Sequence, residues 1–213
     1  MNEQIKSIYE DKNILVINKP AGIKTEEFKK LRNQQFELVH RLDKDTSGVL
    51  ILAKNKKTKD LLQKQFKERK VEKNYLALIL GEIKPKSGTI DLPIIRSKKD
   101  PRKRTIGPSG TGRNAITSYK TLKLFKIDDE ILSLIEAKPI TGRTHQIRVH
   151  LKAWGNPIIG DPLYNSKISK KISTKLDLYR QFLHAKEIKI LNMVFRAPLP
   201  ADLKKILKCL HPI

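Results

Sequence analysis

Residues 38–53 read Leu-Val-His-Arg-Leu-Asp-Lys-Asp-Thr-Ser-Gly-Val-Leu-Ile-Leu-Ala and place a polar stretch between two apolar ones. The run Val49–Ala53 is short and apolar, which predicts a buried strand. Leu38 and Val39 lead into the polar stretch from the other side, so His40–Gly48 forms a loop of nine residues. Polar loops held by rigid strands are common positions for binding and catalytic residues. This loop is therefore the first candidate for a functional site.

Asp43 is the candidate reactive group of the loop. It follows His40 by three residues and Arg41 by two, and these neighbours can orient a carboxylate or balance its charge. Alternatively, Asp43 is a turn residue that accepts hydrogen bonds from the amides of 45–47. A third interpretation takes Asp43 and Asp45 as oxygen ligands of a divalent metal, but no further acidic cluster supports such a site.

The chain is strongly basic. Its 213 residues include 45 lysines and arginines against 22 aspartates and glutamates, a formal net charge of +23. This excess indicates a polyanionic partner, and nucleic acid is favoured over a membrane surface because no amphipathic segment has a bulky aromatic face. The length and the apolar share of 38% fit one folded domain.

The single cysteine, Cys209, excludes an internal disulfide and a zinc site built from cysteine pairs. The apolar runs are far shorter than the ~20 residues that span a bilayer, and residues 1–20 show no signal-peptide pattern. We therefore expect a protein of the reducing cytoplasm that is neither exported nor embedded in a membrane.

Short apolar runs separated by turn residues predict strands along most of the chain. Besides Val49–Ala53, the expected strands are Ile14–Asn18, Asn74–Leu80, Glu187–Ile190 and Met193–Phe195, and a hairpin that joins Ala115–Phe125 to Ile131–Ala137 around Asp128 and Asp129. The expected helices are Thr58–Arg69 with Thr58 as N-cap, Thr144–Trp154 and Ala201–Leu210. Strands outnumber helices, which favours an α+β fold with a largely antiparallel sheet.

The helix expected over Thr144–Trp154 has one apolar stripe. Ile147, Leu151 and Trp154 recur at helical spacing, so we expect all three to face the core. Gly155 stands where a glycine ends a helix.

Arg148 lies next to this stripe, where a partly buried arginine needs an anion, either a phosphate or a carboxylate. The alternative is a basic helix face in solvent. His145 and His150 are five residues apart, not the four of a helical zinc pair, so we expect no metal at this helix.

Residues 96–113 hold seven basic side chains against one aspartate and have almost no apolar content, which predicts a basic loop insertion that is mobile without its partner. Part of this segment, 107–114, approaches a phosphate-binding P-loop. However, Arg113 and Asn114 replace the lysine and the hydroxyl residue of that motif, and no apolar strand precedes it. A loop that contacts a nucleic-acid backbone is therefore preferred over a nucleotide triphosphatase.

Tyr75 follows Lys73 and Asn74 at the start of an apolar run. It is either an ordinary strand aromatic or an aromatic that stacks on a nucleic-acid base. Spacing alone leaves both interpretations open.

The loop His40–Gly48 resembles the signature of the RluA-type pseudouridine synthases, which is histidine-arginine-leucine-aspartate, two variable positions, then threonine-serine-glycine. Five further blocks match this family in order: Asn18–Gly22, Lys73–Tyr75, Gly142–Leu151, Gly160–Tyr164 and Leu183–Ala185. Six blocks spread over residues 18–185 make a chance resemblance very improbable.

The resemblance implies an enzyme that isomerises uridine in RNA to pseudouridine without a cofactor, a nucleotide or a metal. By motif, Asp43 matches the essential aspartate, Tyr75 the tyrosine that packs on the target base, and Arg148 the arginine that pairs with the aspartate. The residues then expected to bind substrate are His40, Arg41, Arg143, His145 and Leu183, the last as an apolar pocket residue.

The resemblance also implies the pseudouridine synthase catalytic fold, a mixed and mostly antiparallel central sheet flanked by helices and loops. We expect one catalytic domain over 1–213, acting as a monomer, with 96–113 and 165–181 as extra RNA contacts. Many relatives carry an additional N-terminal RNA-binding domain, whereas about thirteen residues precede Ile14 here. The expected substrate is ribosomal RNA. The alternatives are transfer RNA, or a non-catalytic RNA-binding or ribosome-assembly protein.

Overall fold

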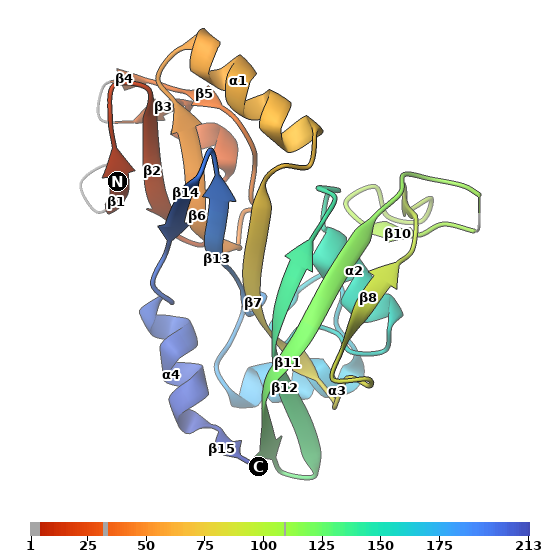
Figure 1. Ribbon diagram of the computed structural model, residues 1–213. Helices are drawn as coiled ribbons and strands as arrows, with labels where there is room; N and C mark the ends of the chain where they lie inside the picture. The colour runs from red at the N-terminus through yellow and green to blue at the C-terminus, as the bar shows by residue number, and fades with distance from the viewer. Residues whose placement is uncertain (1–4, 32–33, 109) are drawn as a thin grey trace. The chain divides into compact units, whose positions relative to one another are not determined.

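The computed structural model describes residues 5–31, 34–108 and 110–213, which form two compact units (Figure 1). Unit 1 comprises Met1–Asn74 and His184–Pro200, and unit 2 comprises Tyr75–Leu183 and Ala201–Ile213. The chain passes between them three times: inside β7 (Glu72–Leu80), inside β13 (Leu183–Ile190) and from Pro200 to Ala201. The expectation of a single catalytic domain over 1–213 stays a prediction.

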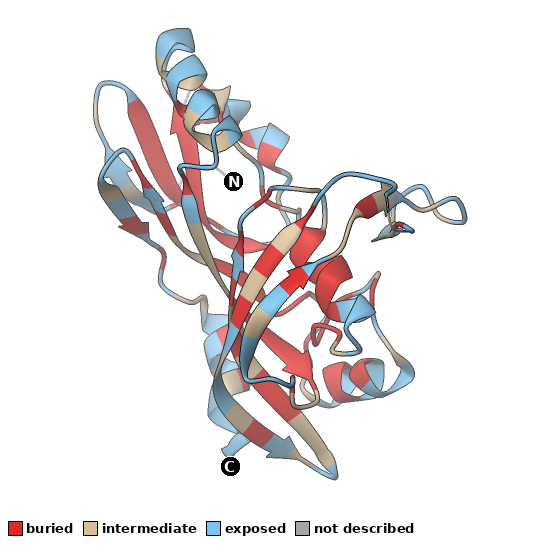
Figure 2. Ribbon diagram, turned by 45° about the vertical axis from the view of Figure 1, so that its right-hand side comes forward, coloured by how far each residue is buried: buried red, intermediate tan, exposed pale blue. Residues whose placement is uncertain are grey.

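Unit 1 is a sheet around one fully buried strand. Its elements are β1 (Ser7–Glu10), β2 (Ile14–Lys19), the 3-10 helix η1 (Thr25–Lys29), β3 (Lys30–Leu31), β4 (Gln34–Gln35), β5 (Glu37–Leu38), β6 (Ser47–Ala53), α1 (Lys56–Lys67), β13 and β14 (Met193–Arg196). The strand order is β1-β2-β6-β13, with β14 on β13 and β5 on β6, while β3 and β4 form a separate pair. All seven residues of β6 are buried (Figure 2).

The start of β6 is paired differently from the rest. β13 runs parallel to it, with His184 opposite Ser47 and Ala185 opposite Gly48. The other pairings of β6, with β2 and β5, are antiparallel. The expected strands Ile14–Asn18 and Val49–Ala53 are thereby confirmed.

The core of unit 1 lies between this sheet and α1. Its buried apolar residues are Ile14, Val16, Val39, Val49, Ile51, Ala53, Leu62, Val71, Ile188, Ile190, Phe195 and Ala197. The helix α1 begins earlier than expected because the side chain of Asn55, not Thr58, is its N-cap. Asn55 accepts a hydrogen bond from the amide of Thr58, which satisfies one of the free amides of the first turn.

Unit 2 is built on a long antiparallel hairpin. Its further elements are β8 (Ser87–Asp91), β9 (Ile94–Arg96), β10 (Arg104–Ile106), β11 (Ile116–Ile127), β12 (Glu130–Pro139), α2 (Gln146–Ala153), α3 (Lys167–Lys175), α4 (Ala201–Cys209) and β15 (His211–Pro212). β12 lies between β7 and β11, and β8 and β15 pair with β11. Ile127 is opposite Glu130, so the hairpin turn at Asp128 and Asp129 is confirmed.

The structure corrects three expectations in unit 2. The segment 96–113 is not a plain loop, because β9 and β10 pair antiparallel across it; position 109 of this segment lies outside the described residues. Residues 165–181 contain α3, a helix that the weak apolar pattern did not predict. Trp154 is 43% exposed at the end of α2, whereas Ile147 and Leu151 are buried as expected.

Within the described residues, four α-helices accompany strands that are mostly antiparallel, which confirms the α+β class with a mixed sheet. Gly155 follows α2 in the left-handed conformation, at φ +91°, as its position predicted. No helix in the described ranges has both the length and the apolar character needed to cross a membrane.

Candidate active site

The ammonium of Lys19 holds the loop His40–Gly48 in place through the backbone of the loop. This side chain is fully buried, and its Nζ donates to the carbonyl oxygens of Pro20 at 2.7 Å, Lys44 at 2.9 Å and Thr46 at 3.0 Å. A buried charge is tolerated only when polar groups replace its water shell, and three carbonyls match the three donors of an ammonium. Two of the three belong to the loop, so Lys19 holds the chain directly after Asp43.

Thr25 fixes the loop directly before Asp43. Its hydroxyl donates to the carbonyl of Leu42 at 2.8 Å and accepts from the amide of the same residue at 3.0 Å. The carbonyl of Asp43 in turn accepts from the amide of Thr46 at 3.1 Å, which closes a turn. The backbone of Asp43 is therefore held on both sides, while its side chain is only partly buried.

The end of the loop is locked to β13. Gly48 has φ +121°, and a Cβ at this position would lie 2.2 Å from the carbonyl oxygen of Ala185, so only glycine fits. Next to it, the hydroxyl of Ser47 lies 3.0 Å from Nδ1 of the buried His184. Nε2 of His184 is 3.1 Å from the carbonyl of Ala197 and must donate to it, so Nδ1 accepts from Ser47.

His40, predicted to bind substrate, is partly buried and makes two structural contacts. Its Nε2 accepts the amide hydrogen of Ile51 at 3.0 Å, and its ring stacks on Phe66 with 5.0 Å between centroids. The imidazole thereby extends the ladder of β6 beyond the end of β5. Burial, helped by the nearby charge of Lys73, lowers the pKa of His40 from 6.5 to about 3, so the ring is neutral. Burial also lowers the pKa of Lys73 itself to about 8.

Arg41 points into solvent. Its side chain is 72% exposed and its Nη2 lies 3.2 Å from Oε1 of Glu26, which is itself half exposed. A surface pair of this kind contributes little to stability. Arg41 is thus accessible to a bound molecule, as a substrate-binding residue must be.

Arg148 is almost completely buried and forms a two-pronged ion pair with Asp161. Nε donates to Oδ2 at 2.7 Å and Nη2 to Oδ1 at 2.8 Å, and the two side chains are 4% and 0% exposed. The expectation that Arg148 needs an anion is confirmed, and the alternative of a solvated basic face is wrong. The predicted pairing of Arg148 with Asp43 stays a prediction.

The start of α2 is organised by the side chain of Gln146. Its Oε1 accepts from the hydroxyl of Thr141 at 2.7 Å and the amide of Arg143 at 2.9 Å, and its Nε2 donates to the hydroxyl of Thr117 at 2.9 Å. The guanidinium of Arg143 donates to the carbonyl of Asn114 at 3.0 Å. These bonds tie the predicted RNA-binding residue Arg143 to the chain just before β11.

His145 occupies the N-cap position of α2 in the left-handed region, at φ 57°, which strains a residue with a Cβ. Its Nδ1 lies 2.8 Å from the hydroxyl of Tyr164. His150, one turn further, is buried between the hydroxyl of Thr117 and the carbonyl of Leu92, and burial lowers its pKa. His145 thus contacts Tyr164 through Nδ1, and His150 connects α2 to its surroundings through both ring nitrogens.

Tyr75 and Leu183 lie on strands at the edge of unit 2. Tyr75 is partly buried on β7, opposite Ala137 of β12. Leu183 is buried at the first position of β13. The predicted site residues thus fall into two groups: His40, Arg41 and Asp43 in unit 1, and Tyr75, Arg143, His145, Arg148 and Leu183 in unit 2.

The sequence did not single out Lys19, Thr25, Gln146 or Asp161, although all four hold predicted site residues or their loops. Three of them lie inside matched blocks, Lys19 in Asn18–Gly22, Gln146 in Gly142–Leu151 and Asp161 in Gly160–Tyr164. Thr25 lies outside every block, and no local pattern distinguishes it from a surface threonine.

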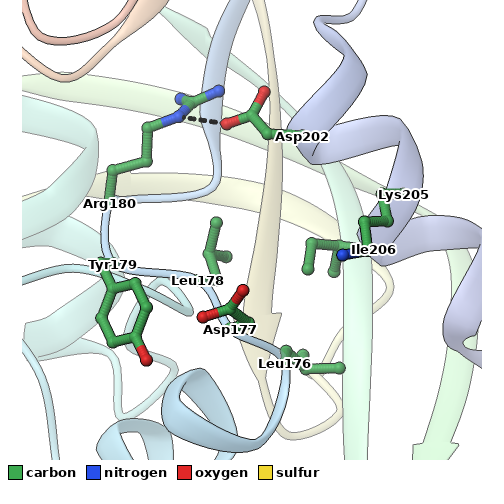
Figure 3. A pocket seen from close by; sticks show the side chains of 8 residues that line it. All are labelled: Leu176, Asp177, Leu178, Tyr179, Arg180, Asp202, Lys205 and Ile206. Atoms are coloured by element: carbon green, nitrogen blue, oxygen red, sulfur yellow. Dashed lines mark hydrogen bonds and ion pairs between the residues drawn. The ribbon is translucent and has the colours of Figure 1, made fainter.

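Unit 2 also contains a pocket of about 340 Å³ (Figure 3). One side of the pocket is the segment that follows α3, and the other side is α4. An ion pair joins Arg180 to Asp202 there at 2.6 Å. The residues that line the pocket are Leu176, Asp177, Leu178, Tyr179, Arg180, Asp202, Lys205 and Ile206. They include two acidic and two basic side chains and none of the predicted site residues.

Comparison with known proteins identifies the family. The sequence model of a protein family described as RNA pseudouridylate synthase matches residues 13–153. The chain is 37% identical to a ribosomal large subunit pseudouridine synthase C of Vibrio parahaemolyticus, with 94% of the chain and 67% of that protein covered. It is 35% identical to an uncharacterized RNA pseudouridine synthase of Bacillus subtilis, with 95% and 71% covered.

A solved structure agrees with these relatives. The human protein RNA Pseudouridylate Synthase Domain Containing 1 is similar with a TM-score of 0.85 and 30% identity, covering 100% of the chain and 90% of the human one. The chain belongs to the RNA pseudouridylate synthase family.

Proposed function

We propose that the chain isomerises specific uridines of ribosomal RNA to pseudouridine, with Asp43 as the reacting carboxylate. The observation that carries this proposal is the loop His40–Gly48, whose backbone is fixed on both sides of Asp43 by Thr25 and Lys19. Such immobilisation suits a group that must meet a reacting carbon at one distance and angle. The ribosomal substrate is supported by the names of the bacterial relatives.

The reaction moves the ribose from N1 to C5 of the uracil. The carboxylate of Asp43 either attacks C1′, so that a C1′–O bond forms as the C1′–N1 bond breaks, or removes the C2′ proton to give a glycal. The released uracil turns and C5 bonds to C1′; on the first route the C1′–O bond to Asp43 breaks as this bond forms, and on the second Asp43 returns the proton to C2′. C5 then loses its hydrogen while N1 gains one. Both routes start from ionised Asp43 and conserve all atoms, so the proposal includes no cofactor, nucleotide or metal.

In this proposal Arg148 favours the ionised form of Asp43 and orients it. Tyr75 stacks on the uracil and Leu183 forms an apolar wall, so that the freed base turns without leaving the site. Arg41, Arg143, His40 and His145 serve substrate binding, the two histidines by shaping the loop and the start of α2 through the contacts described above.

The target uridine must leave its stack before it can react, so we propose that the enzyme flips the nucleotide and grips the RNA around it. The net charge of +23 supplies the phosphate contacts. We propose that the segments 96–113 and 165–181 carry part of them. We also propose that the chain acts as a monomer in the cytoplasm.

The test is tritium release from RNA labelled at C5 of its uridines, because substitution at C5 alone liberates that atom. We expect release from a ribosomal RNA transcript and pseudouridine at the same position when the product is mapped. Release from transfer RNA but not from ribosomal RNA would identify transfer RNA as the substrate instead. Binding of RNA without release from either RNA would support a non-catalytic RNA-binding or ribosome-assembly protein instead.

A further inference from the structure

The geometry points to Tyr164 as a positioning residue with two separable roles: its hydroxyl anchors the basic hairpin β9–β10 for RNA binding, and its ring supports the guanidinium of Arg148. This inference rests on the proposed function, because it takes RNA as the substrate and Arg148 as part of the reacting site. All the groups involved lie in unit 2.

The hydroxyl of Tyr164 joins the hairpin to the start of α2. It accepts the amide hydrogen of Arg104, on β10, at 2.7 Å, and lies 2.8 Å from Nδ1 of His145. A phenol can accept from the first group while it donates to the second, so one oxygen connects the two elements. The rings of His145 and Tyr164 meet edge to face, with 5.6 Å between centroids.

The hairpin needs such an anchor. Three residue pairs join β9 to β10, flanked by backbone bonds from the amide of Ser97 to the carbonyl of Lys103 and from the amide of Gly107 to the carbonyl of Pro93. A two-stranded hairpin of this size is at best marginally stable by itself. Its inner side chains, Ile94 and Ile106, pack in a small cluster with Val149 of α2 and the ring of Tyr164. The hydrogen bond from Arg104 is a directional contact within this apolar cluster, so it fixes the orientation of the hairpin.

The outer part of the hairpin is suited to phosphate. Residues 96–104 carry six basic side chains and one acidic one, Asp100, and most of the connection is exposed. Asp100 folds the connection: it accepts from the amide of Arg102 at 3.0 Å and from its guanidinium at 3.0 and 3.1 Å. A preformed basic surface loses less entropy on binding RNA than a mobile loop does.

The ring of Tyr164 lies against Arg148, with Cζ of the guanidinium 5.1 Å from the ring centroid, within the range of a cation–π contact. Asp161 binds the same guanidinium, and its Oδ1 also accepts from the amides of Leu163 at 2.9 Å and Tyr164 at 3.1 Å. The turn that leads to Tyr164 is therefore held by the carboxylate of Asp161, which also binds Arg148. One side chain contacts the arginine with its ring and the RNA-binding hairpin with its hydroxyl.

Substitution by phenylalanine separates these roles, because it keeps the ring and removes the hydroxyl. The test compares the full chain with Tyr164→Phe and with Tyr9→Phe, a matched loss of a hydroxyl at a tyrosine of unit 1 that is 38% exposed and donates to Asp11. RNA affinity is measured over a range of salt concentrations, and the rate of tritium release is measured in a single turnover at saturating RNA.

We expect Tyr164→Phe to weaken RNA binding about fivefold, the effect of one lost hydrogen bond of ordinary strength. The slope of log affinity against log salt should become shallower by about the amount that one phosphate contact contributes, while the rate at saturating RNA stays within about twofold of the parent. Tyr9→Phe should match the parent in all three. Unchanged affinity and slope in Tyr164→Phe, or a collapse of the saturated rate, would overturn the inference.

A second comparison tests whether the hydroxyl acts through the hairpin. The double change Arg102→Gln and Lys103→Gln should lower the salt slope in the parent, and should lower it less when Tyr164→Phe is already present. Equal reductions in both backgrounds would contradict the anchoring role. Affinity and salt slope do not require turnover, so these measurements stand even if no uridine is isomerised and the proposed function fails.

Discussion

Nε and Nη2 of Arg148 hold both oxygens of Asp161, and neither side chain is accessible to solvent beyond 4%. The pair connects α2, which contains Arg148, to the turn that begins at Asp161 and precedes α3. Removing the guanidinium leaves the buried carboxylate of Asp161 without its counter-charge, which is among the costliest single changes in a protein.

Arg148→Met should therefore destabilise the chain by about 3–5 kcal/mol, and adding Asp161→Asn should recover part of this loss. Chemical denaturation of the two variants measures the difference. Neither should release tritium from RNA, because the proposal requires the guanidinium at the reaction itself. A folded Arg148→Met with full activity would remove Arg148 from the site.

Lys19→Met should cost at least about 3 kcal/mol, since it removes three charge-assisted hydrogen bonds that the ammonium donates to carbonyl oxygens. Two of them belong to the loop of Asp43, so the rate at saturating RNA should fall even below the unfolding temperature. Lys44→Met, at an exposed lysine of the same loop, is the control and should change stability by less than about 0.5 kcal/mol. If both variants unfolded alike, the buried ammonium would not be what holds the loop.

The histidines make the fold sensitive to acid. The pKa of His40 is about 3 in the folded chain and 6.5 as the unperturbed value, so below pH 6.5 the unfolded chain gains a proton that the folded chain does not. Stability is therefore fully present above about pH 6.5 and falls towards pH 3, by up to about 1.4 kcal/mol per pH unit from this group. Burial lowers the pKa of His150 too, and it acts in the same direction.

His40→Asn keeps a hydrogen-bond acceptor for the amide of Ile51 and should flatten this dependence when the free energy of unfolding is measured from pH 7 to pH 4. His211→Asn, at an exposed histidine, should leave it unchanged. A slope that persisted in His40→Asn would place the acid sensitivity elsewhere.

Local patterns predicted the elements whose causes are local. The turn at Asp128 and Asp129 brought Ile127 opposite Glu130, and Gly155 ended α2 as its position indicated. The helix α3 escaped prediction because its buried face is made of Ser169, Ile172 and Ser173. There, hydroxyl groups bond to backbone where apolar side chains would normally pack, so hydrophobic periodicity is weak.

Long-range partners could not be predicted in this way. The parallel pairing of β13 with the start of β6 joins residues more than one hundred positions apart and leaves no local signal. Periodicity placed Trp154 in the core, but α2 ends there and the indole is half exposed. The sequence showed that Arg148 needs an anion, yet only the fold identifies Asp161 as one.

The central claim, that Asp43 performs the reaction, is tested most directly by the single-turnover rate of tritium release from uridine-labelled RNA in Asp43→Asn. This change keeps the shape of the side chain and removes its charge, and Asp45→Asn in the same loop is the matched control. We predict that Asp43→Asn slows release by more than about 10³-fold while RNA affinity stays within a few fold, and that Asp45→Asn retains the parental rate. Release by Asp43→Asn at the parental rate would contradict the account.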